Sequence, residues 1–309
     1  MTARRDDDWT QQPERGSMAL MRLIAWIGLR LGRPAARALL YPICLYFMCF
    51  APAPRRAGRA YLARALGHPA SWREQFRHIH TFASTILDRI FLLNDRLELF
   101  EFHIHGEELA RQASQSRQGR LVLGAHMGSF EAVRAIGHHN PDAPPVALLM
   151  YEANAQKMSR VMGAINPAAK QEIIALGELD AMLRVQTRLS EGAFIGMLAD
   201  RSFNTDQIRD EVRWLPFLGS PAPFPLGPFR LAALLRRPLL LMLGLYQGGR
   251  RYDIHFELLA DFSQPGLDRQ QAVEQAQAHY VARLEHYCRA SPYNWFNFYD
   301  FWNTGNAPH

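Results

Sequence analysis

Short apolar runs alternate with amphipathic stretches from about residue 100 onward, and this alternation limits the possible folds more than any other feature of the chain. Four of the runs are RLVLGA, PPVALLM, QEIIAL and GAFIGMLA, each bounded by glycine, proline or a charged residue. The stretches NAQKMSRVMGAI and LDAMLRVQTRLSEG between them have the apolar spacing of helices. We therefore predict an α/β fold with a mixed central sheet flanked by helices, which gathers functional groups at the carboxyl ends of its strands.

The rest of the chain predicts further elements. Residues 237–259 have the pattern of a β-hairpin whose two apolar runs are joined by Gly248 and Gly249. The segment LPFLGSPAPFPL, with four prolines, predicts a rigid ordered loop, and Pro228 begins the next helix. Helical spacing predicts two more helices, marked by Phe76, Ile79, Phe82, Ala83, Ile86 and Ile90 and by Val273, Ala276, Tyr280, Leu284 and Tyr287. His78 and His80 on the first of them are assigned no role.

The N-terminal part of the chain is basic and apolar at once. Ten arginines and no acidic residue lie from Arg15 to Arg73, in a chain whose net charge is +6. This bias indicates an anionic partner, either nucleic acid or a membrane surface. The residues between the arginines are aliphatic and aromatic, as in MALMRLIAWIGLRLGRPAARALLYPICLYFMCFAP. Such a pattern favours a membrane over nucleic acid.

The sequence leaves several ways for this segment to meet a membrane. Its uncharged stretch, residues 38–50, has 13 residues and contains Pro42. A full span needs about 20 residues, so an interfacial or re-entrant helix pair is favoured over a single longer span. A buried core helix is a further alternative. A signal peptide is disfavoured, because the run begins late and Pro54 would follow the cleavage site.

Length and composition fit one large folded unit. The chain has 309 residues, of which 48% are hydrophobic and 21% charged, which excludes a disordered protein. Cys44, Cys49 and Cys288 have no metal-ligand spacing, so we expect neither a disulfide framework nor a zinc site, and a reducing compartment. The predicted divisions are a flexible tail (1–17), a membrane-anchoring segment (18–54), the main domain (55–303) and a short tail (304–309).

A histidine and a glutamate follow the first apolar run, in the stretch LVLGAHMGSFEAVRA. A carboxylate beside a histidine fixes its tautomer and its developing positive charge, which suits removal of a proton from a hydroxyl group. His126 and Glu131 meet only if the histidine lies in the turn before a helix, and Gly124 and Gly128 permit such a turn. The spacing alone also fits a locally bonded histidine with a surface glutamate.

The stretch LGAHMGSFEAVRAIG resembles the first motif, H-x-x-x-x-D/E, of the bacterial lipid A biosynthesis acyltransferases, a branch of the lysophospholipid acyltransferase superfamily. The later stretches GMLADRS and LPFLGSPAPFPLGPFRLA are similar to the family's aspartate after a strand, its Phe-Gly-x-Pro-Ala loop and its Gly-Pro helix start. The resemblance covers roughly residues 20–300. It implies a glycerolipid acyltransferase-like domain with membrane-associated N-terminal helices.

The resemblance implies roles for particular residues. His126 would be the general base that deprotonates an acceptor hydroxyl, and Glu131 would orient it. The implied substrate-binding residues are Gly128, Ser129, Arg160, Asp200 and Arg201. Arg160 corresponds to a family arginine that holds a phosphate or sugar group, a task that suits a planar guanidinium. The alternatives are a solvated helix arginine at Arg160 and a structural salt bridge at Asp200 and Arg201.

The implied activity is O-acyl transfer from acyl carrier protein, or from coenzyme A, to a lipid hydroxyl at the cytoplasmic face of a bacterial inner membrane. The expected partners are the acidic carrier protein, membrane lipids and the lipid acceptor, without nucleic acid, cofactor or metal. A lipid-binding or assembly protein without turnover is the alternative. Hydrolysis through an acyl-enzyme ranks last, because the chain lacks a Gly-x-Ser-x-Gly elbow and Ser129 follows His126 too closely.

Two departures from related patterns bear on the acceptor. Ala125 precedes the histidine and SEGAF lacks a Thr-Arg pair, which disfavours the lysophosphatidate acceptor of glycerolipid enzymes. WFNFYDFW replaces the basic Trp-x-x-Arg-Arg-like segment of lipid A enzymes. Sequences of this type resemble the acyltransferases that accompany aryl-polyene pigment synthesis, so a lipid-linked polyene is an alternative acceptor. The aromatic cluster is expected to line an acyl or aryl pocket, to lie at the membrane face, or to cap the core.

Overall fold

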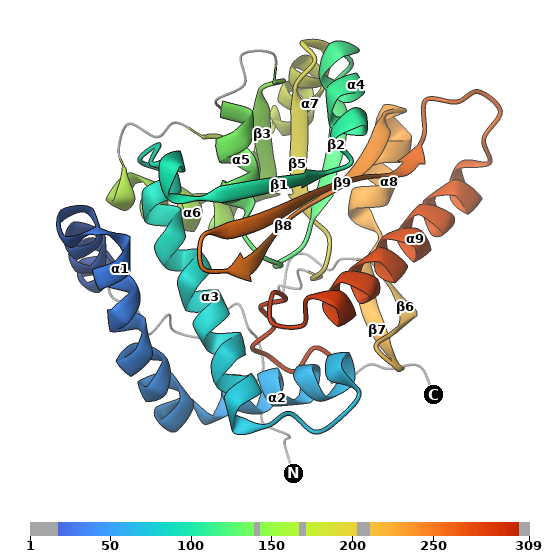
Figure 1. Ribbon diagram of the computed structural model, residues 1–309. Helices are drawn as coiled ribbons and strands as arrows, with labels where there is room; N and C mark the ends of the chain where they lie inside the picture. Colours follow the sequence, from blue (N-terminus) through green and yellow to red (C-terminus); the bar gives the residue numbers. More distant parts are fainter. Residues whose placement is uncertain (1–17, 139–142, 167–170, 203–210, 303–309) are drawn as a thin grey trace.

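The structure, a computed structural model, describes residues 18–138, 143–166, 171–202 and 211–302 (Figure 1). A seven-stranded sheet with the order β1-β9-β8-β2-β5-β3-β4 forms its centre, and β6 and β7 form a separate pair. The strands are β1 (Glu101–His105), β2 (Arg120–Gly124), β3 (Val146–Tyr151), β4 (Glu172–Leu176), β5 (Phe194–Leu198), β6 (Val212–Phe217), β7 (Ser220–Pro225), β8 (Pro238–Gly248) and β9 (Arg251–Asp261). In the large sheet β9 runs antiparallel to β8 and the other neighbours pair in parallel, so the predicted mixed α/β sheet is confirmed.

Helices cover both faces of the large sheet. One hydrophobic core lies under α2 (Pro52–Leu66), α7 (Ala181–Ser190), α8 (Gly227–Leu235) and α9 (Arg269–Ala290). A second core lies under α1 (Met18–Phe50), α3 (Trp72–Leu92) and α5 (Phe130–His138). Helix α4 (Glu107–Gln115) packs on β9, and α6 (Glu152–Ile165) packs on β3 and β4, while a short 3-10 helix (Leu97–Leu99) leads into β1. The sheet is therefore the middle layer of three.

Side-chain alternation explains why the parallel strands are apolar throughout. Leu121 and Leu123 of β2 belong to the core under α7, α8 and α9, whereas Val122 between them faces the other side. The hairpin predicted over residues 237–259 is confirmed as β8 and β9. The amphipathic helix predicted around Tyr280 is confirmed as α9, and the one around Phe82 as α3.

The proline-rich segment is a strand pair instead of the predicted loop. Strands β6 and β7 pair in antiparallel fashion, with Pro216 opposite Pro221. Pro223 and Pro225 follow Pro221 at intervals of two residues on the same strand. Positions two apart in such a ladder share one bonding type, so the missing N–H groups fall where no cross-strand hydrogen bond is needed. The prolines stiffen the strands without breaking their pairing, and Pro228 lies in the first turn of α8, as predicted.

Helix α1 is fixed to α3 by a buried ion pair. The Arg33 guanidinium donates hydrogen bonds to both carboxylate oxygens of Asp88 at 2.7 Å. The Tyr252 hydroxyl of β9 donates to the same carboxylate at 2.9 Å, and Asp88 has no exposed surface. Next to this pair, residues four apart on α1 are buried, namely Ala36, Leu40, Cys44 and Met48. One face of α1 is thus part of the protein core.

The opposite face of α1 is apolar and exposed. Its large exposed side chains are Trp26, Leu29, Leu31, Leu39, Tyr41, Leu45, Tyr46 and Phe50. In the part of the chain that the structure describes, no single helix has the length and composition of a membrane span. The segment from Trp26 to Phe50 and helix α2 meet that description only together, and they are bent by 96°.

The domain boundaries predicted from the sequence do not all coincide with the ends of these elements. The boundary expected at residue 54 falls inside α2, which continues to Leu66. The flexible tails predicted at residues 1–17 and 304–309 lie outside the described residues.

Replacement of Asp88 by Asn should lower the free energy of unfolding by about 3–5 kcal/mol, because it leaves the Arg33 charge buried without its counter-charge. Urea unfolding of the purified protein, followed by circular dichroism, measures the change. Glu98→Gln, in the exposed Arg96–Glu98 pair, is the control and should leave the unfolding midpoint unchanged. Equal midpoints for Asp88→Asn and the wild type would contradict a stabilising role for the pair.

Candidate active site

His126 lies just beyond the end of β2, beside the end of β5. The two strands pair in parallel with Gly124 opposite Leu198, and the same offset beyond both strand ends brings His126 next to Asp200. The Nδ1 atom of His126 lies 2.9 Å from Oδ1 of Asp200, and the backbone N–H of His126 donates to Oδ2 at 3.0 Å. An ionised carboxylate only accepts hydrogen bonds, so Nδ1 carries the proton and Nε2 is left with a free lone pair.

Electrostatics keep the histidine neutral and the aspartate charged. Burial and the charge of Arg201 lower the pKa of His126 from its usual 6.5, while Asp200 acts in the opposite direction. Burial by itself raises the pKa of Asp200, but His126, Arg201 and the Trp295 N–H outweigh burial and hold that pKa well below its usual 3.8. Asp200 has no exposed surface, whereas the His126 side chain is 35% exposed and lines a cavity. The pair is therefore a neutral base next to an anion at neutral pH.

Glu131, which the sequence predicted to orient His126, has other partners. Its Oε1 lies 2.6 Å from Nε of Arg89, and its Oε2 accepts a hydrogen bond from the Ser129 hydroxyl at 3.4 Å. Glu131 stands in the first turn of α5, and its pairing with Arg89 directs it to α3 and not to β5. The carboxylate that holds Nδ1 of His126 in the structure is that of Asp200. The register of two parallel strands decides this, and a spacing within one segment cannot reveal it.

Backbone hydrogen bonds fix the loop at residues 126–129 on two sides. Gly128 has φ +67°, and a Cβ there would lie 2.0 Å from the Gly244 carbonyl oxygen, so the position requires glycine. Its N–H donates to the Asn294 carbonyl at 2.9 Å, and the Ser129 N–H donates to the Gly244 carbonyl at 2.8 Å. The Ser129 hydroxyl caps α5 by accepting from the Ala132 N–H at 3.2 Å. Gly128 and Ser129, two of the five predicted substrate-binding residues, line the cavity, although Ser129 is only 2% exposed.

A cavity of about 820 Å³ opens beside His126. Its apolar lining is rich in flexible methionines and includes Val122, Leu148, Met150, Met158, Met162, Met182, Met197, Leu198 and Met242. Methionine side chains adapt to chains of varying shape. Four cationic residues, Arg89, Arg134, Lys157 and Arg201, also contribute to the wall. A largely apolar cavity whose lining also contains a base and several cations fits an amphiphilic ligand.

The two predicted arginines lie in different surroundings. Arg201 lines the cavity, donates from Nη2 to the Phe296 carbonyl at 2.7 Å, and lies over the Tyr299 ring at 5.1 Å from its centroid. Arg160 is exposed on α6 and is not among the residues that line the cavity. Lys157, nearly one turn earlier on the same helix, does line the cavity. The structure thus puts Lys157 instead of Arg160 at the cavity. The two residues point in different directions from the same helix, and the motif match did not show which of them faces the cavity.

The C-terminal aromatic segment is divided between the core and the cavity. Trp295 is fully buried, whereas Phe296, Phe298 and Tyr299 line the cavity. Trp295 forms an isolated antiparallel bridge with Met127, and the Phe296 N–H donates to the His126 carbonyl at 2.8 Å. Two of the predicted roles, pocket lining and core packing, are therefore both confirmed. The contact with the histidine loop was not predicted, and no spacing signal connects two segments so far apart in the chain.

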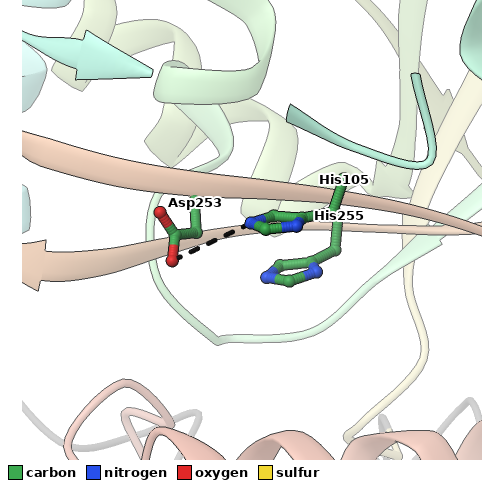
Figure 2. Close-up of side chains that lie close together, drawn as sticks. All are labelled: His105, Asp253 and His255. Atoms are coloured by element: carbon green, nitrogen blue, oxygen red, sulfur yellow. Dashed lines mark ion pairs between the residues drawn. The ribbon is translucent and has the colours of Figure 1, made fainter. Parts of the chain in front are cut away.

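Among the described residues, three possible metal ligands gather outside the cavity, on β1 and β9 (Figure 2). The His105 and His255 rings are stacked at 4.4 Å with an angle of 8° between their planes. The lone pairs of two stacked rings lie in two separate parallel planes and do not converge on one atom, unlike those of the ligands of a tetrahedral site. Asp253 is also paired with Arg251, at 2.8 Å from Nε. This cluster is a stacked pair at the edge of the sheet, and we assign it no metal role.

The geometry supports removal of a proton by His126 Nε2 from a hydroxyl group that enters the cavity. Ser129 is poorly placed to act as a nucleophile, because its hydroxyl is bound to α5 and to Glu131. Cys288 is buried, and burial raises the pKa of its thiol far above the usual 9.0. The arrangement therefore favours a nucleophile that comes from a substrate.

The comparison with known protein families agrees with this interpretation of the site. The profile of the family described as bacterial lipid A biosynthesis acyltransferase matches residues 11–304. A comparison with curated proteins finds no match. The family match covers nearly the whole chain and agrees with the motifs around His126 and Asp200. The chain therefore belongs to the bacterial lipid A biosynthesis acyltransferase family, whose name indicates acyl transfer to a lipid acceptor.

Proposed function

We propose that this protein transfers a fatty acyl chain from a thioester donor to a hydroxyl group of a lipid, with His126 as general base and Asp200 as the carboxylate that orients it. The observation that carries the proposal is the 2.9 Å contact between His126 Nδ1 and buried Asp200 at the border of a large apolar cavity. This differs from the role that the resemblance implied for Glu131. Glu131 instead supports the α5 side of the cavity through Arg89.

In the proposed reaction Nε2 of His126 takes the proton of the acceptor hydroxyl as its oxygen attacks the thioester carbonyl. The C–O bond forms and the carbonyl oxygen carries the negative charge of the tetrahedral intermediate. The C–S bond then breaks, and the thiolate leaves with the proton returned by the imidazolium. Asp200 stabilises that imidazolium and keeps Nδ1 protonated throughout. The products are an ester of the lipid and a free thiol.

Acyl carrier protein is the proposed donor, because α2 offers it a basic surface next to the site. Arg56 and Arg59 are exposed on this helix, which contains no acidic residue. Tyr61 of α2 packs on Trp295 with 4.9 Å between ring centroids, so α2 borders the segment that lines the cavity. An acidic carrier protein docked there would present its thioester close to His126. Coenzyme A is the alternative donor.

The lipid acceptor is proposed to reach the site at the cytoplasmic face of a bacterial inner membrane. Helix α1 is kinked at Gly32, and it exposes Trp26 and Arg30 before the kink and Tyr46 and Phe50 after it. Exposed aromatic and basic residues are typical of helices that lie in the membrane interface. A lipid A-like glycolipid and a lipid-linked polyene would both fit an acceptor that enters the apolar cavity.

Transfer assays with radiolabelled acyl carrier protein and a total lipid extract of the source organism, resolved by thin-layer chromatography, test the reaction. His126→Ala should lower the rate by about 10²–10⁴-fold, because the general base is lost. Asp200→Asn should lose nearly as much, since the amide no longer enforces the tautomer with a free Nε2. Glu131→Gln should lose much less. Parallel assays with acyl coenzyme A identify the donor.

Three outcomes would contradict the proposal. Full activity of a folded His126→Ala protein would exclude His126 as the base. A larger loss in Glu131→Gln than in Asp200→Asn would return the orienting role to Glu131. A wild-type protein that binds lipid but leaves both thioesters unconsumed would support a binding function without turnover.

The rate should also depend on pH through His126. Neutral imidazole is the active form, so activity is present above the His126 pKa and is lost as the pH falls through it. Burial and Arg201 lower that pKa from its usual 6.5, so the half-maximal rate should fall on the acid side of pH 6.5. A profile of kcat/KM from pH 5 to pH 9 measures the acid limb. A half-maximal rate above pH 7 would conflict with a base of lowered pKa.

Flotation with vesicles tests the proposed membrane contact. The protein should float with vesicles that contain anionic phosphatidylglycerol and less with pure phosphatidylcholine. A triple variant, Trp26→Ser, Tyr46→Ser and Phe50→Ser, should bind about tenfold or more weakly, because it loses the apolar area that enters the interface. Leu234→Ser, at a residue 70% exposed on α8, is the matched control and should bind as the wild type does. Equal flotation of the triple variant would exclude this face as the membrane contact.

A further inference from the structure

Trp295 binds the carboxylate that holds His126, although it does not line the cavity. Its indole Nε1 donates to Oδ2 of Asp200 at 2.9 Å. Both side chains have no exposed surface. The other oxygen, Oδ1, faces Nδ1 of His126. The indole therefore occupies the side of the carboxylate that the imidazole leaves open.

An aspartate side chain can rotate about its last bond, and rotation here would move Oδ1 away from the imidazole. The Trp295 N–H and the His126 backbone N–H both bind Oδ2, and each comes from a rigid part of the core. Donors on both oxygens define the plane of the carboxylate. A catalytic group needs this kind of support, because small displacements from the reactive geometry are costly in rate.

Trp295 is itself held from several directions. Its backbone carbonyl accepts a hydrogen bond from Nε2 of His78 at 2.8 Å. His78 is 1% exposed, and burial lowers its pKa to about 4, so it stays neutral with its proton on Nε2 at neutral pH. The Trp295 ring packs against Tyr61 at 4.9 Å and Phe217 at 5.4 Å between centroids. The preceding Asn294 binds both the N–H and the carbonyl of Tyr246 through its side chain.

We infer that Trp295 is a positioning residue of the active site, whose indole N–H locks Asp200 in the orientation that keeps the proton of His126 on Nδ1 and its Nε2 lone pair in the cavity. The inference rests on the proposed function for its effect on turnover, but not for its effect on the tautomer of His126.

Among the described titratable groups around Asp200 and Trp295, His126 is the group whose charge changes near neutral pH. Burial raises the pKa of Tyr280, Tyr299 and the Cys288 thiol well above their usual values, so these groups remain neutral up to strongly alkaline pH. An acid limb in the activity profile therefore reports the environment of His126.

The test replaces Trp295 by Phe, which keeps an aromatic ring but removes the N–H. The rate constant kcat should fall by about 10- to 100-fold, as when a group that orients a catalytic ligand is removed, with KM unchanged because Trp295 does not touch the cavity. Without the indole N–H, the negative charge of Asp200 is less compensated and should stabilise the protonated form of His126 more strongly. The pKa of His126 should therefore rise, and the acid limb of the activity profile should move to higher pH. The ¹⁵N shifts of the His126 ring, in protein labelled at histidine, should change from one tautomer to a mixture.

Trp302→Phe is the matched control. Trp302 belongs to the same aromatic cluster, at 6.2 Å from Trp295, but its Nε1 donates to the Phe217 carbonyl and not to Asp200. It should alter stability at most and leave the acid limb and the His126 tautomer unchanged. If Trp295→Phe and Trp302→Phe behave alike, the role of Trp295 is only structural and the inference is overturned.

A second replacement covers failure to fold. If Trp295→Phe does not fold, β-(3-benzothienyl)alanine at this position preserves the shape of the indole and replaces only its N–H by sulfur. An unchanged His126 tautomer and acid limb in this variant would overturn the inference. The nitrogen shifts need no turnover, so they decide the positioning role even if wild-type protein transfers no acyl chain. The experiments can therefore contradict the proposed function without contradicting this inference, and the reverse.

Discussion

A buried carboxylate needs hydrogen-bond donors, and the geometry of the site follows from how the chain supplies them to Asp200. Two donors come from His126 and one from Trp295, which belong to segments far apart in the sequence. An ionised group without exposed surface is stable only when such partners are in place. The end of β2, the end of β5 and the C-terminal aromatic segment are therefore mutually fixed. Displacement of any one of them would weaken the support of this buried charge.

A second buried carboxylate, Asp88, does for the N-terminal helix what Asp200 does for the site. It binds Arg33 of α1 and Tyr252 of β9, so the helix with the exposed apolar face is joined to the layer that supports the cavity. The same helix thus has a core face and an outward face. The part of α1 that follows the kink at Gly32 is thereby packed on the layer that supports the cavity.

The sequence was sufficient to predict those strands and helices whose burial produces a pattern of apolar residues within the element itself. The runs that became β2, β3, β4 and β5 are apolar on both faces, and α9 has one apolar stripe, so each could be predicted from its own residues. The strand pair β6–β7 was missed, because its prolines suggested a loop and their harmless positions depend on the pairing. His126 was found through its motif. Its partner was not, since Asp200 rather than Glu131 becomes its neighbour only through the register of β2 and β5.

The bridge between Met127 and Trp295 also affects how the protein matures. Ribosomes deliver the chain in order, so α1 and the first strands are available long before residues 294–299 emerge. Until those residues pack, Asp200 lacks its indole partner and the wall with Phe296 and Tyr299 is absent. The reactive centre is therefore complete only after the C-terminal segment has folded back onto the loop that follows β2.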